Sequence, residues 1–155
     1  MFTDNGKKPA AAAEISGSEK YNTLSGRVNF YDTYGGTVVT VQVRGIPKEF
    51  ENGFLGFHIH EGGSCTGNEK DPFADAGGHY NPEERPHPEH KGDLPPLLNG
   101  NGTAWMAVYT DRFYPDEVIG KTVIIHSKPD DFRTQPSGDS GEKIACGKIK
   151  EWQGR

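Results

Sequence analysis

The six histidines of this chain follow a metal-ligand pattern, and none is left outside it. Imidazole nitrogen is a common protein donor for zinc and copper, so six imidazoles and one nearby carboxylate can supply two metal sites. The pattern therefore indicates metal-dependent chemistry. Its members are His58, His60, His79, His87, His90, His126 and the carboxylate residue Asp93.

The first two histidines stand two residues apart, as His58-Ile59-His60. Alternate residues of a strand point to the same face, so both rings can share one ion while Ile59 faces a core. A solvated pair on an exposed face is the alternative. The pair is thus a candidate part of one metal site.

The densest group is His87, His90 and Asp93, which fall within seven residues. Prolines on both sides of His87 restrict the unfolded loop and so reduce the entropy lost when it becomes ordered. The cysteine pairs of a zinc finger and the HExxH helix of a metalloprotease are both absent from the sequence. The group favours zinc, with a polar surface loop as the alternative.

Two single histidines complete the set. His79 follows Gly77-Gly78, where glycines permit tight backbone turning near an ion. His126 ends an apolar run, from which a ligand can point towards a loop. Taken singly, each has a simpler interpretation: His79 as a loop histidine without function, and His126 as a histidine at a sheet edge.

Four further residues are candidates for a supporting part. Asp130 follows His126 by four residues, and metal-bound histidines usually donate their second N–H to such an acceptor. The alternative is that Asp130 is an exposed loop aspartate.

A disulfide bond between Cys65 and Cys146 would close a loop of about 80 residues and stabilise the fold by about 4 kcal/mol, but two buried thiols fit the spacing equally well. Such a bond would draw Lys143, otherwise an ordinary surface lysine, towards the metals.

The elements that must position these residues are short strands. The chain has 21 Gly and 11 Pro, so turns are frequent. About seven or eight short strands with almost no helix predict an all-β fold, either a β-sandwich or a small barrel. The expected strands include 24–30, 37–43, 54–61, 103–109, 122–126 and 143–150, with one helical turn in 114–120 and long loops over 62–101 and 128–142.

The two ends of the chain and its net charge further limit the possible domain organisation, partners and location of the protein. We expect a polar tail over residues 1–18 and a single domain over 19–155. The net charge of −5 argues against nucleic-acid and membrane binding, because both need excess positive charge. The N-terminus shows no apolar signal segment, which predicts a cytoplasmic protein, or an exported one whose leader has been trimmed.

A series of segments stands in a specific order: 56–61 (GFHIHE), Cys65, 77–82 (GGHYNP), 92–95 (GDLP), His126 with Asp130, and 144–147 (IACG). Together, over about residues 24–150, they resemble the copper/zinc superoxide dismutase family, of bacterial type. The resemblance implies a Greek-key β-sandwich, or flattened eight-stranded barrel, with two long functional loops. The family is itself a known example of the sandwich architecture.

The resemblance also implies a role for each candidate. Copper would be bound by His58, His60, His79 and His126, and zinc by His79, His87, His90 and Asp93, so that His79 is shared. Cys65 and Cys146 match the family disulfide. Asp130 matches the residue that hydrogen-bonds ligands of both metals, and Lys143 stands where the family usually carries a substrate-guiding arginine.

The implied activity is the conversion of superoxide to oxygen and hydrogen peroxide by copper redox cycling, with one copper and one structural zinc per chain. His79 would take up a proton in the first half-step. Because the net charge repels an anion, Lys143 must provide a local attraction, with Lys128 and Arg133 as candidate helpers. A homodimer is a further expectation.

Three features depart from the family pattern. Lys143 lacks the planar donor fork of arginine, the His87–His90 gap is short and requires a tight turn, and the second loop is also short. One alternative is a non-enzymatic protein of this fold that binds or delivers zinc or copper. Another is a structural sandwich with incidental histidines. All four copper positions are histidine, which favours the enzyme.

Overall fold

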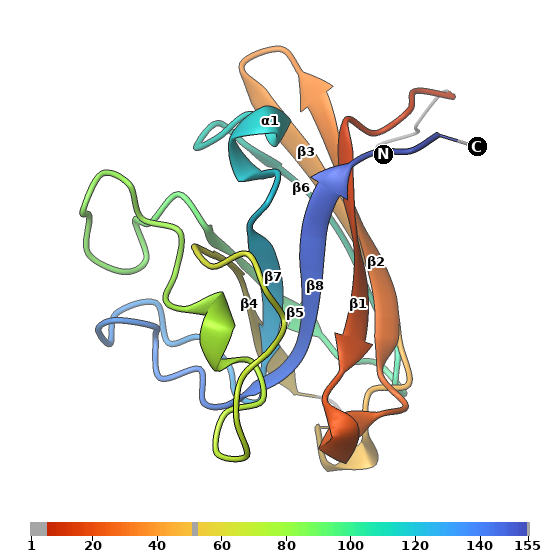
Figure 1. The fold of residues 1–155 in the computed structure, drawn as a ribbon, viewed down its shortest axis with the longest axis vertical. Coiled ribbons are helices and arrows are strands. Elements are labelled where there is room, and N and C mark those ends of the chain that lie inside the picture. The colour runs from red at the N-terminus through yellow and green to blue at the C-terminus, as the bar shows by residue number, and fades with distance from the viewer. Residues whose placement is uncertain (1–5, 51–52, 155) are drawn as a thin grey trace.

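A computed structural model of the chain describes residues 6–50 and 53–154. Its strands form one antiparallel eight-stranded sheet in the order β5-β4-β7-β8-β1-β2-β3-β6. The sheet curves round on itself (Figure 1), and its end strands β5 and β6 contact each other, so the barrel is nearly closed. The strands are β1 (Ala11–Gly17), β2 (Ser25–Thr33), β3 (Gly36–Arg44), β4 (Phe54–His60), β5 (Asp93–Leu98), β6 (Ala104–Thr110), β7 (Thr122–His126) and β8 (Lys143–Glu151).

Helical structure in the described residues is limited to single turns. They are α1 (Pro115–Val118) and the 3-10 turns Glu19–Tyr21, Lys48–Phe50 and Ala74–Ala76. No helix in this part of the chain has the length and apolar character needed to cross a membrane. The all-β prediction is therefore confirmed, including the single helical turn near residue 115.

The barrel core is built by the alternation of strand residues. Val28 and Phe30 of β2 face inwards with Val39 and Val41 of β3. Most of their sequence neighbours point towards solvent or lie half-buried, and Tyr31 is the buried exception. A strand with one buried face requires this period of two. The pattern explains why β2 and β3 could be predicted from sequence.

Strands β4 and β7 are buried on both faces. Phe57 and Ile59 of β4 belong to the barrel core, whereas His58 and His60 point to the opposite face. That face is covered by the connections 61–92 and 127–142, which appear in Figure 1 as the green and light-blue loops. The covering loops give the histidines a buried environment outside the core.

A disulfide anchors the first covering loop to the barrel. Cys65 in the loop is bonded to Cys146 on β8, with 5.7 Å between the Cα atoms. Ile124, Phe73 and Ala76 pack with Cys146 in a second apolar cluster under the loop. Because the bond closes a loop of 81 residues, it stabilises the fold by about 4 kcal/mol in the chain-entropy model. The disulfide implied by the resemblance is confirmed.

Two expectations about the chain are wrong. The segment Ala11–Gly17, expected within a polar tail over 1–18, is strand β1 between β2 and β8, with Ala13 and Ile15 buried. The domain therefore begins before residue 19. Residues 1–5 of the expected tail lie outside the described residues.

The expected loop over 62–101 also contains a strand, β5 (Asp93–Leu98). This strand carries Pro95 and Pro96, which lack the N–H groups of a central strand. Proline is tolerated because β5 lies at an end of the sheet and pairs with β4 alone. The strand places Asp93 opposite His58 of β4.

Candidate metal centre

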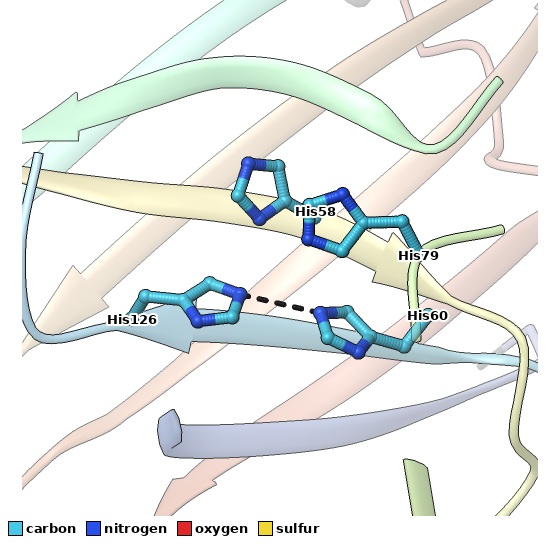
Figure 2. Close-up of side chains that lie close together, drawn as sticks. All are labelled: His58, His60, His79 and His126. Atoms are coloured by element: carbon cyan, nitrogen blue, oxygen red, sulfur yellow. Dashed lines mark hydrogen bonds between the residues drawn. The ribbon is translucent and has the colours of Figure 1, made fainter. Parts of the chain in front are cut away.

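Four histidines converge on the outer face of β4 and β7. His58 and His60 project from β4, His126 ends the adjacent β7, and His79 joins them through a backbone bridge to His60. Figure 2 shows the four rings directed towards one another, and a candidate nitrogen of each lies within 4.8 Å of those of the others. The arrangement predicted for the copper-type set is thus present.

Hydrogen bonds fix which nitrogen of His60 and His126 is bare. Nδ1 of His60 donates to the carbonyl oxygen of Gly77 at 2.7 Å, and Nδ1 of His126 faces that of Gly141 at 3.4 Å. A neutral imidazole carries one N–H, so both Nε2 atoms are unprotonated. These two atoms lie 3.2 Å apart (the dashed line in Figure 2), and two bare acceptors at that distance favour a cation between them.

Asp130 joins the two groups of histidines. Its carboxylate accepts Nε2–H of His58 and Nε2–H of His87, both at 2.8 Å. Each bond leaves Nδ1 of that ring bare and directed into the site. Asp130 is buried, which agrees with the role predicted for it as a hydrogen-bond acceptor for the histidines.

A second donor set surrounds Asp93. Its carboxylate lies 2.8 Å from Nδ1 of His79, 3.0 Å from Nδ1 of His87 and 3.2 Å from Nδ1 of His90. The short segment between His87 and His90 forms the tight turn that was predicted, closed by a bond from the Glu89 N–H to the Pro86 carbonyl. His79 belongs to both sets.

Three buried nitrogens in this centre have no hydrogen-bond partner. They are Nδ1 of His58, Nε2 of His79 and Nδ1 of His87. A buried polar atom without a partner costs free energy, and native proteins rarely leave one unpaired. These nitrogens point where bound ions would provide the partner, so the residues present fit two metal ions.

The electrostatics of the centre favour uncharged rings. Burial lowers the pKa of His58 to about 4 and outweighs the hydrogen bond to Asp130, which acts in the opposite direction. Burial also holds the pKa values of His60 and His126 well below the ordinary range. Burial alone would raise the pKa of Asp93, but the neighbouring imidazoles outweigh it and lower that pKa. Neutral imidazoles and an ionised carboxylate are the forms that bind metals.

Comparison with known proteins agrees with this geometry. Residues 24–149 match the family model described as copper/zinc superoxide dismutase. A superoxide dismutase [Cu-Zn] of Aquifex aeolicus is 32% identical over 90% of this chain and 86% of its own. That of Escherichia coli is 37% identical over 81% and 78%. This chain belongs to the copper/zinc superoxide dismutase family.

Solved structures agree with the assignment. The Cu/Zn superoxide dismutase from Brucella abortus superposes with a TM-score of 0.75 at 27% identity and covers 90% of this chain and 99% of its own. A double mutant of a SOD-like protein from Bacillus subtilis gives 0.73 at 28% identity, covering 88% and 94%. The fold is therefore that of the copper/zinc superoxide dismutases, which use copper and zinc to act on superoxide.

Sequence reasoning missed two residues that support this dismutase site. The Arg112 guanidinium donates to the carbonyls of Pro88 and His90 at 2.8 and 2.9 Å and so holds the loop that carries the second donor set. Gly138 has a positive φ, and a Cβ there would overlap the Asp130 carboxylate and crowd His87. Neither residue lies in a motif that predicts its partner.

A pocket opens beside the copper-type set. His60, His79 and His126 line it together with Lys143, Lys70 and Asp71. The predicted position of Lys143 near the site is therefore correct. The suggested helpers Lys128 and Arg133 are exposed and do not line the pocket, whereas sequence reasoning overlooked Lys70 and Asp71.

Proposed function

We propose that this chain disproportionates superoxide to oxygen and hydrogen peroxide at a copper site, with zinc as a structural ion. The observation that carries the proposal is the pair of donor sets that share His79, because their facing nitrogens are bare and buried. Imidazoles suit copper in both redox states, and three imidazoles with one carboxylate suit tetrahedral zinc.

The bonds described above support one choice of donor atoms. Copper would be held by Nδ1 of His58 and Nε2 of His60, His79 and His126, and zinc by Nδ1 of His79, His87 and His90 with the Asp93 carboxylate. Bound copper supplies the one-electron redox change. Nε2 of His79 faces the copper set without a hydrogen bond, so it is the atom that can hold a proton during turnover.

The test is reconstitution of the metal-free protein. We expect copper plus zinc to give superoxide consumption, and zinc alone to give none, because zinc has no redox chemistry. Elemental analysis and a superoxide assay on the same samples measure both outcomes. Protein that binds one copper and one zinc per chain without consuming superoxide would instead support the metal-delivery alternative.

Lys143 is proposed to attract the anionic substrate. We expect Lys143→Glu to lower the rate constant with superoxide about tenfold and to weaken its fall with added salt, because it reverses the charge at the pocket. Stopped-flow kinetics at several ionic strengths measures this. Lys148→Glu makes the same net change on an exposed part of β8 and serves as the control. Equal rates in the two variants would remove Lys143 from this role.

A homodimer is also proposed. Where β5 and β6 meet, a groove includes Pro95, Tyr109 and Phe132, and both aromatic side chains are half exposed, at 54% and 51%. Exposed aromatic rings are typical of surfaces that bind a partner, so this groove favours association with a second copy. We expect Tyr109→Glu to shift sedimentation from dimer to monomer, while Tyr34→Glu, at a fully exposed hairpin tip, leaves it unchanged. A monomeric parent protein would contradict the proposal.

A further inference from the structure

The cation at the pocket is already paired. Nζ of Lys143 donates to Oδ2 of Asp71 at 2.6 Å, and the two side chains are only 18% and 36% exposed. Water therefore screens this ion pair less than it would screen a pair on the open surface. Asp71 itself lines the pocket, so the opposing charge lies on the route of an entering anion.

Asp71 is held in place by its own loop. Its Oδ1 accepts the Phe73 N–H at 3.0 Å, and its carbonyl accepts the N–H groups of Asn68 and Ala74. The carboxylate is thus fixed by a turn on one side and fixes the ammonium of Lys143 on the other. The disulfide also ties this loop to β8, the strand on which Lys143 stands.

The remaining charges do not restore a strong attraction. Glu142, next to Lys143, also lines the pocket and accepts a hydrogen bond from the Tyr21 hydroxyl at 2.7 Å. Lys70 is the other cation among the described residues that line the pocket. The pocket volume of about 570 Å³ greatly exceeds a diatomic anion, so charge rather than shape must direct the substrate.

We propose that Asp71 is a positioning residue that holds the Lys143 ammonium against the pocket wall and attenuates the uptake of small anions. This inference rests on the proposed function of the same site. An entering anion competes with the Asp71 carboxylate for the same ammonium donors. Removing the negative charge of Asp71 while keeping its turn therefore makes the site more attractive to anions.

Asp71→Asn is the decisive variant, because its amide oxygen can still accept the Phe73 N–H while the charge is lost. We expect the rate constant with superoxide at low ionic strength to rise about threefold to tenfold, with a steeper fall as salt is added. Azide should bind the copper-loaded variant several-fold more tightly. Asp75→Asn is the matched control, since it removes one charge from the same loop at an exposed residue outside the pocket.

A second measurement needs no metal. In metal-free protein, acylation of Lys143 by an N-hydroxysuccinimide ester, followed by peptide mass spectrometry, should be several-fold faster in Asp71→Asn than in the parent. Lys121 is the internal control, because it pairs with Glu61 at 3.0 Å and should be acylated at the parent rate. Asp71→Ser, whose hydroxyl can also support the turn, replaces the asparagine variant if that protein folds poorly.

The outcomes separate the two proposals. Unchanged or slower acylation of Lys143, or a rate constant in Asp71→Asn no higher than in Asp75→Asn, overturns the role of Asp71. If Lys143→Glu behaves as its control while acylation rises in Asp71→Asn, the ion pair positions Lys143, but the proposed attraction of substrate by Lys143 fails.

Discussion

Replacing His79 by alanine is expected to abolish superoxide consumption and to weaken the binding of both copper and zinc. His79 is the residue that both donor sets share, so its loss leaves three donors on each side. Removing a residue that only supports a ligand already costs about 10–100-fold in affinity or activity, so removing a shared ligand should cost about 100-fold or more. Metal content after dialysis and a superoxide assay measure the effect.

Two other alanine variants make the comparison specific. His126 belongs only to the copper-type set and His90 only to the zinc-type set. We expect His126→Ala to lose copper but retain zinc, and His90→Ala to lose zinc first. A His79→Ala protein that loses one metal and keeps the other at parent affinity would contradict the sharing of His79.

The sequence predicted the parts of this fold whose signal is local. The alternation around Phe57 and Ile59 placed His58 and His60 on one face, and β-branched residues marked β3. The sequence did not predict β1, because alanine and serine have a weak preference for strands and make its alternation hard to see. It did not predict β5, because two prolines argue against a strand unless the position of that strand at the sheet edge is known.

The site could be predicted only as far as its motifs reach. The spacing of His87, His90 and Asp93 indicated one donor set, and the resemblance implied that His79 is shared. The contacts of Asp71 with Lys143 and of Arg112 with the carbonyls of the 61–92 loop join residues 72 and 22–24 positions apart. Such contacts depend on how the loops close over the barrel, which no local pattern specifies.

Asp130→Asn is expected to weaken copper binding about 10–100-fold and zinc binding less. Oδ1 of Asp130 accepts from His87 and from the Phe132 N–H, whereas Oδ2 accepts from His58 alone. An asparagine keeps the most hydrogen bonds by placing its oxygen at the first position. Its NH₂ group then faces Nε2–H of His58, so this ring loses its acceptor and no longer holds Nδ1 bare.

Competition titrations with chelators of known affinity measure both metals separately in this variant. Asp131→Asn is the control, because Asp131 is exposed and its Oδ1 accepts the N–H groups of Arg133 and Thr134, bonds that an asparagine can keep. Burial alone would raise the pKa of Asp130, but the bonds from His58 and His87 outweigh it and lower that pKa, so the residue acts as a carboxylate. Copper affinity equal to that of the control would show that His58 keeps its orientation without Asp130, and the link between the two donor sets would then have no part in metal binding.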